Sequence, residues 1–158
     1  MKNTTLLFLV KKDEDTITDI CLAMKKRGFG AGRYNGAGGK VEEGETVEQA
    51  VTREVKEEMG VDVLDCLKVG ELIFLFPHKE EWNQLVHIYI TENWEGEVEE
   101  TEEMNPKWFR RGDIPYETMW SDDILWLPYV LEGKYVSGDV TFGEGDVILS
   151  QEVRVMQG

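Results

Sequence analysis

Cysteine is scarce in this sequence of 158 residues, which contains only Cys21 and Cys66. The two residues do not have the spacing of metal ligands, and both lie in apolar, strand-like segments. We therefore expect reduced core thiols, which are typical of a cytoplasmic protein, and no disulfide framework. The chain is long enough to bury a core without cross-links, so we expect a single domain over residues 1–158.

Long apolar runs are also missing. The first apolar run covers only residues 6–10, which is too short for the core of a secretory signal and is followed by charged residues. No run approaches the roughly 18 apolar residues that a membrane-spanning helix requires. The sequence therefore predicts a protein without a membrane partner.

Positive charge is in short supply. The 17 basic residues face 32 acidic ones, which gives a formal net charge of -15. This balance argues against binding to a nucleic-acid polymer or an anionic membrane. A small anionic ligand is compatible with it, because a local basic cluster or a bound cation can reverse the field within one cleft. The cluster Lys25, Lys26 and Arg27 is such a place.

Strand-like patterns outnumber helical ones. Residues 5–10 and 20–24 are rich in β-branched and large apolar side chains, and we expect them to form a hairpin. Two or three further strands are expected within residues 61–76 and 85–92. Shorter strand signals lie at residues 107–109 and on both sides of residues 143–146.

Two segments have helix signals. Residues 45–59 begin near a Thr46 N-cap and end before Gly60, a residue favoured just after a helix. A second helix is expected from a cap at Ser121 or Asp122 through about residue 131, where Pro128 predicts a kink. Two helices on a mixed sheet correspond to an α/β or α+β fold.

The first of these helices has an unusual distribution of charge. At helical spacing, Val47, Val51 and Val55 form one apolar stripe, and Glu54, Glu57 and Glu58 fall within the same stripe. Three close carboxylates in a half-buried wall repel each other unless a cation or a guanidinium neutralises them. Hard oxygen ligands of this kind suit Mg²⁺ or Mn²⁺.

Arg53 precedes these glutamates and can pair with Glu57 one helical turn later, which would hold that carboxylate in place. The alternative interpretation is a solvent-facing acidic helix end with ordinary pairs to Lys56 and Arg53. The helix pattern by itself favours neither.

The glycine-rich segment 28–39 precedes this helix and is expected to be a loop or a bulged strand. It matches neither a phosphate-binding Walker loop nor a dinucleotide-binding fingerprint. Counted from Gly39, however, the chain reads five residues, Glu45, seven residues and then REVKEEMGV over 53–61. This string resembles the Nudix box, G-x5-E-x7-R-E-U-x-E-E-x-G-U with U a bulky apolar residue, at every defined position.

The resemblance implies a Nudix α/β/α sandwich with a loop–helix–loop element that binds Mg²⁺ and hydrolyses nucleoside diphosphate derivatives. Flanking strings, among them 24–46, 102–109, 114–128 and 138–149, resemble Nudix members that act on oxidised purine nucleoside triphosphates such as 8-oxo-dGTP. The products would be the monophosphate and pyrophosphate, and the role would be sanitation of the nucleotide pool.

The same resemblance implies roles for individual residues. The metal site would comprise Gly38, Glu54, Glu57, Glu58 and Glu103, with Mn²⁺ as an alternative to Mg²⁺. The catalytic residues would be Glu54, Glu57 and Arg53, and the sequence leaves open whether Glu54, Glu57 or Glu103 is the general base. The substrate would be bound by Thr5, Lys25, Phe29, Asn35, Ala37, Gly38, Gly39, Lys40, Phe74, Trp120, Asp122, Asp123 and Trp126.

Asp122 and Asp123 make physical sense as base-binding groups, because neighbouring acids in a dry pocket can exchange protonation states and so donate or accept. The alternative for this pair is helix capping. The chain departs from the family pattern at Gln84, where the family has Met, at Ser121, where it has Pro, and in a first hairpin two residues longer. These departures bear on base preference and leave the chemistry intact.

Two other functions stay open at this stage. The first is hydrolysis of another nucleoside diphosphate derivative, such as a dinucleoside polyphosphate, a nucleotide sugar or an ordinary nucleotide. The second is a nucleotide sensor that binds without cleaving, which the complete set of Arg53 and three glutamates disfavours. In each case the partner is a small molecule, and we expect a monomer.

Overall fold

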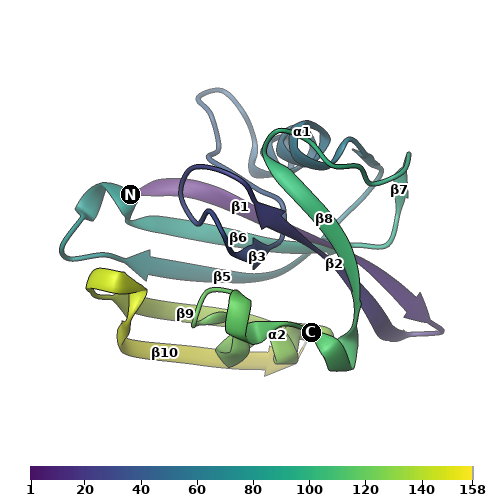
Figure 1. Ribbon diagram of the computed structural model, residues 1–158. Coiled ribbons are helices and arrows are strands. Elements are labelled where there is room, and N and C mark those ends of the chain that lie inside the picture. Colours follow the sequence, from purple (N-terminus) through teal and green to yellow (C-terminus); the bar gives the residue numbers. More distant parts are fainter. Residues whose placement is uncertain (158) are drawn as a thin grey trace.

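The computed structural model describes residues 1–157, which form one large mixed sheet, a small two-stranded sheet and two α-helices (Figure 1). The strands of the large sheet are β1 (Lys2–Asp13), β2 (Thr16–Lys25), β3 (Tyr34–Asn35), β5 (Leu67–Leu75), β6 (Gln84–Thr91), β8 (Met104–Arg110), β9 (Lys134–Phe142) and β10 (Ile148–Gln157). The remaining elements are the strands β4 (Asp62–Val63) and β7 (Trp94–Glu95) and the helices α1 (Val47–Met59) and α2 (Asp123–Leu131).

The sheet is mixed at its centre. β1 runs parallel to β6 and antiparallel to β2, and β5 runs antiparallel to β6 and parallel to β9. β1 and β2 pair only from Val10 onward, so the two strands diverge over the part of β1 that precedes Val10. The edge of β1 that β2 leaves free is where the glycine-rich loop docks.

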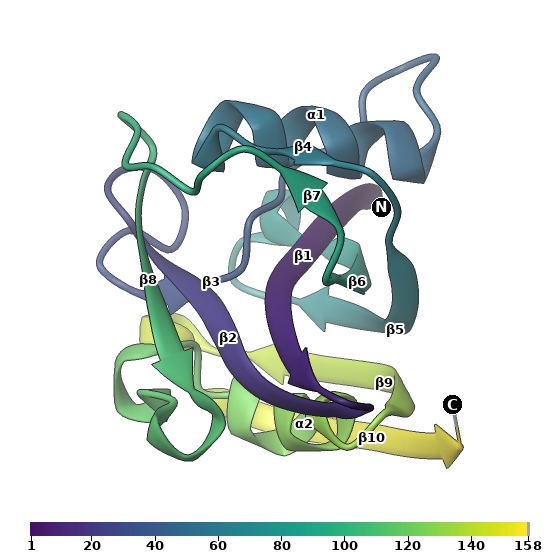
Figure 2. The same cartoon turned by 90° about the vertical axis from the view of Figure 1, so that its right-hand side faces the viewer.

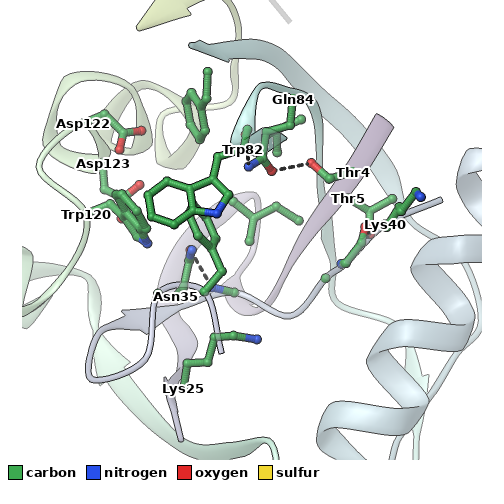
Figure 3. Close-up of a pocket in the computed structure, with 18 of the residues that line it drawn as sticks. Thr4, Thr5, Lys25, Asn35, Lys40, Trp82, Gln84, Trp120, Asp122 and Asp123 are labelled. Atoms are coloured by element: carbon green, nitrogen blue, oxygen red, sulfur yellow. Dashed lines mark hydrogen bonds between the residues drawn. The ribbon is translucent and has the colours of Figure 1, made fainter. Parts of the chain in front are cut away.

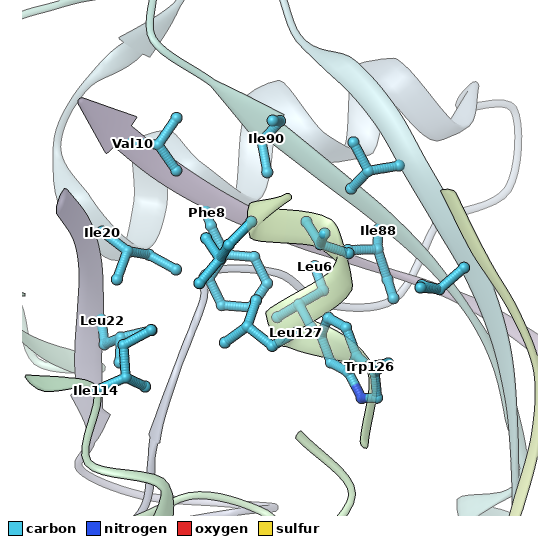
Figure 4. Close-up of a cluster of buried hydrophobic side chains, with 14 of the residues drawn as sticks. Leu6, Phe8, Val10, Ile20, Leu22, Ile88, Ile90, Ile114, Trp126 and Leu127 are labelled. Atoms are coloured by element: carbon cyan, nitrogen blue, oxygen red, sulfur yellow. The ribbon is translucent and has the colours of Figure 1, made fainter. Parts of the chain in front are cut away.

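Alternating residues of β1 pack against different helices. Leu7 and Leu9 belong to a core cluster with the apolar stripe of α1, whereas Leu6, Phe8 and Val10 belong to a larger cluster with α2. Figure 4 shows the second cluster, and Figure 2 shows α1 and α2 on opposite sides of β1. Because successive side chains of a strand point to opposite faces, the continuous apolar run 6–10 is explained by burial on both faces. The expected α/β/α sandwich is therefore confirmed.

Most of the expected elements are present. The first hairpin is confirmed, although its turn is tighter than residues 11–19, because both strands extend through most of that segment. The loop 28–39 contains the short strand β3. Both cysteines are free, and burial raises the pKa of the Cys21 thiol to about 12. Within residues 1–157, no helix is long and apolar enough to cross a membrane.

The start of α2 differs from the expectation. Asp122 has a helical backbone and its side chain makes no capping hydrogen bond, so capping does not explain this residue. Its carboxylate instead accepts a hydrogen bond of 2.7 Å from the Trp126 indole one turn later. The helix continues past Pro128 to Leu131, so the proline does not end it, and the kink stays a prediction.

Helix α1 has the predicted Thr46 N-cap and the predicted end before Gly60, and its first residue is Val47 where the sequence predicts residue 45. The Thr46 hydroxyl accepts from the Gln49 N–H at 3.1 Å, the Gln49 side chain accepts from the Thr46 N–H at 2.9 Å, and Gly60 ends the helix at a φ of 76°. This reciprocal capping box satisfies two backbone donors that would otherwise lack partners.

We predict that Thr46→Ala lowers the free energy of unfolding by about 1 kcal/mol, because it removes the N-cap acceptor. The melting temperature should fall by about 2–4 °C, which thermal unfolding followed by circular dichroism would measure. Thr52→Ala, at an exposed site within α1, is the matched control and should shift the melting temperature less. Equal effects of the two substitutions would contradict the capping role.

Candidate active site

The glycine loop is attached to the free edge of β1 by backbone hydrogen bonds. Leu7 and Ala37 exchange bonds of 2.7 and 2.9 Å, and the Thr5 N–H donates to the Gly39 carbonyl at 2.9 Å. The approach is close enough that a Cβ at Gly38 would lie 1.8 Å from the Thr5 carbonyl oxygen. Only glycine fits at this position. The loop is thereby held directly over the last two turns of α1.

Two of the three helix glutamates face this loop. Glu58 is 4% exposed, and its carboxylate accepts a hydrogen bond of 2.8 Å from the Gly38 N–H. The Glu54 carboxylate lies so close beneath Gly39 that a Cβ there would be 2.6 Å from it. Glu57 is different, with a side chain that is 58% exposed. The solvent-facing interpretation of this helix end is thus wrong for Glu54 and Glu58 and holds only for Glu57.

Arg53 connects the loop and the helix. Its guanidinium donates two hydrogen bonds to Glu45, of 2.7 and 3.0 Å, and one of 2.8 Å to Glu54. It also donates to the Lys40 carbonyl at 3.1 Å. The predicted pair with Glu57 is present but longer, at 3.4 Å. Arg53 therefore fixes Glu54 more firmly than Glu57, and its main partner is Glu45, a pair that was not predicted.

These carboxylates line an acidic cleft. The cleft is bounded by Lys25, Arg27, Gly38, Gly39, Glu54, Glu57, Glu58, Thr101, Glu102 and Glu103. Burial, followed by the nearby charge of Glu54, raises the pKa of Glu58 to about 8. A hydrogen bond from Arg27 lowers the pKa of Glu103, which also borders the cleft.

The cleft suits a hard divalent cation, although its side chains are not arranged around one. Within residues 1–157, no three His, Cys, Asp or Glu side chains have a metal-binding arrangement. Arg53, Arg27 and the Gly38 N–H each hold one of the carboxylates instead. All acidic groups of the cleft are carboxylates, which are hard oxygen ligands, and burial followed by the charge of Glu54 disfavours the ionised form of Glu58. The donor set therefore fits a hard divalent cation.

A second, deeper cavity of about 340 Å³ adjoins the acidic cleft and shares Lys25, Gly38, Gly39 and Glu58 with it. Asp122 and Asp123 lie at its far end (Figure 3), and both are almost fully buried. One carboxylate oxygen of each has no hydrogen-bond partner among residues 1–157. Unpartnered buried oxygens are costly and point to a ligand that satisfies them.

Burial also changes the ionisation of this pair. It raises the pKa of Asp122 to about 6, in spite of the hydrogen bond from Trp126. The pKa of Asp123 is raised well above its ordinary value by burial and then by the charge of Asp122. The pair can therefore hold a proton near neutral pH, when an isolated surface aspartate would be fully ionised.

Aromatic side chains form much of the cavity wall. Phe29 lies between Trp82 and Trp120, with ring centroids 5.1 Å from each. Phe74 and Trp126 line the cavity as predicted, and so do Phe76 and Trp82, which were not predicted. Trp82 lies in the polar turn 77–83, where a single aromatic residue among charged ones gives no periodic signal.

Most of the other predicted substrate-binding residues line the cavity, and one does not. Thr5, Lys25, Asn35 and Lys40 line the cavity together with the loop glycines. Ala37 does not, because its side chain is fully buried in the core cluster beneath α1. Its contribution to the site is the backbone pairing with β1.

The family to which known proteins assign this chain agrees with the geometry of the site. A family model described as the NUDIX domain matches residues 2–130. The chain is 47% identical over 134 residues to an oxidized purine nucleoside triphosphate hydrolase of Danio rerio, covering 85% of each chain. It is 45% identical over 135 residues to the protein of the same name from Mus musculus, covering 85% of this chain and 86% of that one.

Among solved structures, a mutator MutT protein from Bacillus halodurans superimposes with a TM-score of 0.82 at 22% identity, covering 97% of both chains. This likeness supports the fold alone. The box of Gly39, Glu45, Arg53 and the helix glutamates is thus found in the expected loop and helix and within the matched residues. On this evidence the chain belongs to the Nudix hydrolase family.

Proposed function

We propose that this protein hydrolyses oxidised purine nucleoside triphosphates, such as 8-oxo-dGTP, to the nucleoside monophosphate and pyrophosphate. The observation that carries the proposal is the buried pair Asp122 and Asp123, which lines an aromatic cavity next to the acidic cleft. The two relatives named for this activity support it.

The cavity suits a purine in both shape and chemistry. Aromatic walls provide stacking surfaces, and a neutral carboxyl can donate a hydrogen bond where an ionised one can only accept. Oxidation changes the pattern of donors and acceptors on a purine. A carboxyl pair that holds one proton near neutral pH can match such a pattern, because either residue can carry the proton.

The triphosphate would extend from this cavity toward the acidic cleft, past Lys25, which lines both. Mg²⁺, or alternatively Mn²⁺, would be held there by Glu54, Glu57, Glu58, Glu103 and the Gly38 carbonyl. When bound, the cation neutralises charge on phosphate oxygens and lowers the pKa of the attacking water.

The chain's own groups would then orient the reaction. Arg53 keeps the Glu54 carboxylate in position through its bonds to Glu45 and the Lys40 carbonyl. Glu54, Glu57 or Glu103 would accept the proton of the attacking water, since all three border the cleft. We further propose that the enzyme is a cytoplasmic monomer of one domain that acts on free nucleotides and not on nucleic-acid polymers.

A nucleotide panel with product analysis tests the substrate class. With Mg²⁺, oxidised purine triphosphates should be cleaved to the monophosphate and pyrophosphate with a higher kcat/KM than dGTP, and chelation of the metal should stop the reaction. Faster cleavage of a dinucleoside polyphosphate, a nucleotide sugar or an unmodified nucleotide would assign another substrate. Binding of the panel without any product would identify a sensor.

We predict that Glu57→Gln lowers turnover by about 10²- to 10⁴-fold, because the amide has neither the charge nor the basicity of the carboxylate. The protein should still fold, since the Glu57 side chain is largely exposed. Steady-state kinetics and the melting temperature measure the two effects. Glu117→Gln, at an exposed site outside the cleft, is the control and should retain activity. Near-wild-type turnover of the Glu57 variant would refute the assignment.

The Asp123 carboxyl should reduce stability at high pH. The pKa of Asp123 is raised in the folded state, so protonation of this group favours folding. The stability that it contributes is fully present below about pH 4 and is lost as pH rises through its folded-state pKa. We predict that Asp123→Asn, which cannot ionise, raises the melting temperature by about 2–5 °C at pH 8 and by much less at pH 5. Activity on oxidised purines should fall at the same time.

Thermal unfolding at several pH values checks this prediction, with exposed Asp113→Asn as the matched control. We expect the charged form of the Asp123 carboxyl to be disfavoured in the folded protein because it is buried. A stability gain of Asp123→Asn that does not depend on pH, or a loss of stability at pH 8, would contradict this expectation.

A further inference from the structure

Gln84 is a polar residue of the cavity wall that lies next to apolar side chains. It is the first residue of β6, is 9% exposed, and pairs in register with Phe74 of β5. Phe74 and Val86, which lie beside it on the same face of the sheet, both line the cavity. An amide group in such a wall is costly unless its hydrogen bonds are made.

The hydrogen bonds of Gln84 fix the orientation of its amide. The Nε2 atom donates to the Trp82 carbonyl at 3.0 Å, and the Oε1 atom accepts from the Thr4 hydroxyl at 2.9 Å. A carbonyl can only accept, so the Trp82 contact determines which end of the amide carries the N–H groups. One of the two Nε2 hydrogens has no partner among residues 1–157. The amide therefore offers the cavity a donor, while its carbonyl oxygen already accepts from Thr4.

The segment that presents this donor is held independently of any ligand. The Asn83 side chain accepts from the Phe76 N–H at 2.6 Å, and the Trp82 N–H donates to the Lys79 carbonyl at 2.9 Å. The Trp82 ring packs against Phe29 and Phe76. A donor fixed in this way needs no rearrangement to meet a ligand.

We propose that Gln84 is a specificity-determining residue that donates a hydrogen bond from Nε2 to an oxygen of the nucleobase. Figure 3 shows Gln84 and Thr4 on the side of the cavity opposite Asp122 and Asp123, so that a base held between them meets both. The aspartate pair can donate or accept, whereas the Gln84 amide presents its second Nε2 hydrogen as a donor. It therefore favours purines that carry an additional oxo group over the parent purines.

This inference rests on the proposed function, and its test uses pairs of nucleotides that differ by one oxo group. We would measure kcat/KM of the wild type and of Gln84→Met, which has a similar volume and no donor, on 8-oxo-dGTP with dGTP and on 2-oxo-dATP with dATP. The substitution should lower one of the two oxo-to-parent ratios by about three- to tenfold, chiefly through KM. The affected pair identifies the oxygen that Gln84 contacts.

Two control variants separate direct contact from other effects. Gln151→Met, on the exposed strand β10, makes the same chemical change away from the cavity and should leave both ratios unchanged. Asn83→Ala loosens the turn but keeps the amide, so it should change the affected ratio less than Gln84→Met does. The proposal is overturned if Gln84→Met alters all four nucleotides equally or none, or if Asn83→Ala reproduces its effect.

Failure of the proposed function would have a different signature. In that case the wild type would cleave none of the four nucleotides faster than other nucleoside diphosphate derivatives. The contact made by Gln84 would then be measured from equilibrium binding of the same four nucleotides, followed by quenching of tryptophan fluorescence, with the same variants and the same expected change in ratio.

Discussion

The contact between the glycine loop and the free edge of β1 sets the geometry of both halves of the site. Residues 37–39 take the place beside β1 that β2 leaves when the two strands diverge. This pairing brings the Gly38 N–H to Glu58 and lays Gly39 over Glu54, with no space for a side chain at either glycine. Without the docked loop, the last turns of α1 would be an ordinary acidic surface, and the cavity would lose one wall.

The site contains three carboxyls whose burial opposes folding. Glu58, Asp122 and Asp123 are buried, and burial is the first cause of the raised pKa of each. Buried charges without full compensation oppose stability. Glu58 borders the acidic cleft, and Asp122 and Asp123 line the aromatic cavity. This division matches a substrate with a metal-binding phosphate end and a base that needs adjustable hydrogen bonds.

The two positions are joined through the same short stretch of chain. Lys25 and the loop glycines border both the cleft and the cavity, so a ligand that fills one is brought to the other. The defined positions of the Nudix box supply most carboxylates of the cleft but only Gly39 and Glu58 of the cavity. The rest of the cavity is assembled mainly from β1, β5, β6, the glycine-rich segment and the start of α2, and it includes Gln84 and Trp82. Base selection can therefore change without altering the groups that act on the phosphates.

The sequence by itself determined the helix α1, its caps and the spacing of its glutamates, because these depend on neighbours within one or two turns. It also indicated most strands and, through the Nudix box, the family. Only the tertiary structure decided that Glu58 is buried while Glu57 is exposed, that Glu45 is the main partner of Arg53, that Ala37 packs in the core, and that Trp82 reaches the cavity. Most of these depend on contacts between segments distant in the chain, such as Leu7 with Ala37, and local pattern carries no information about such contacts.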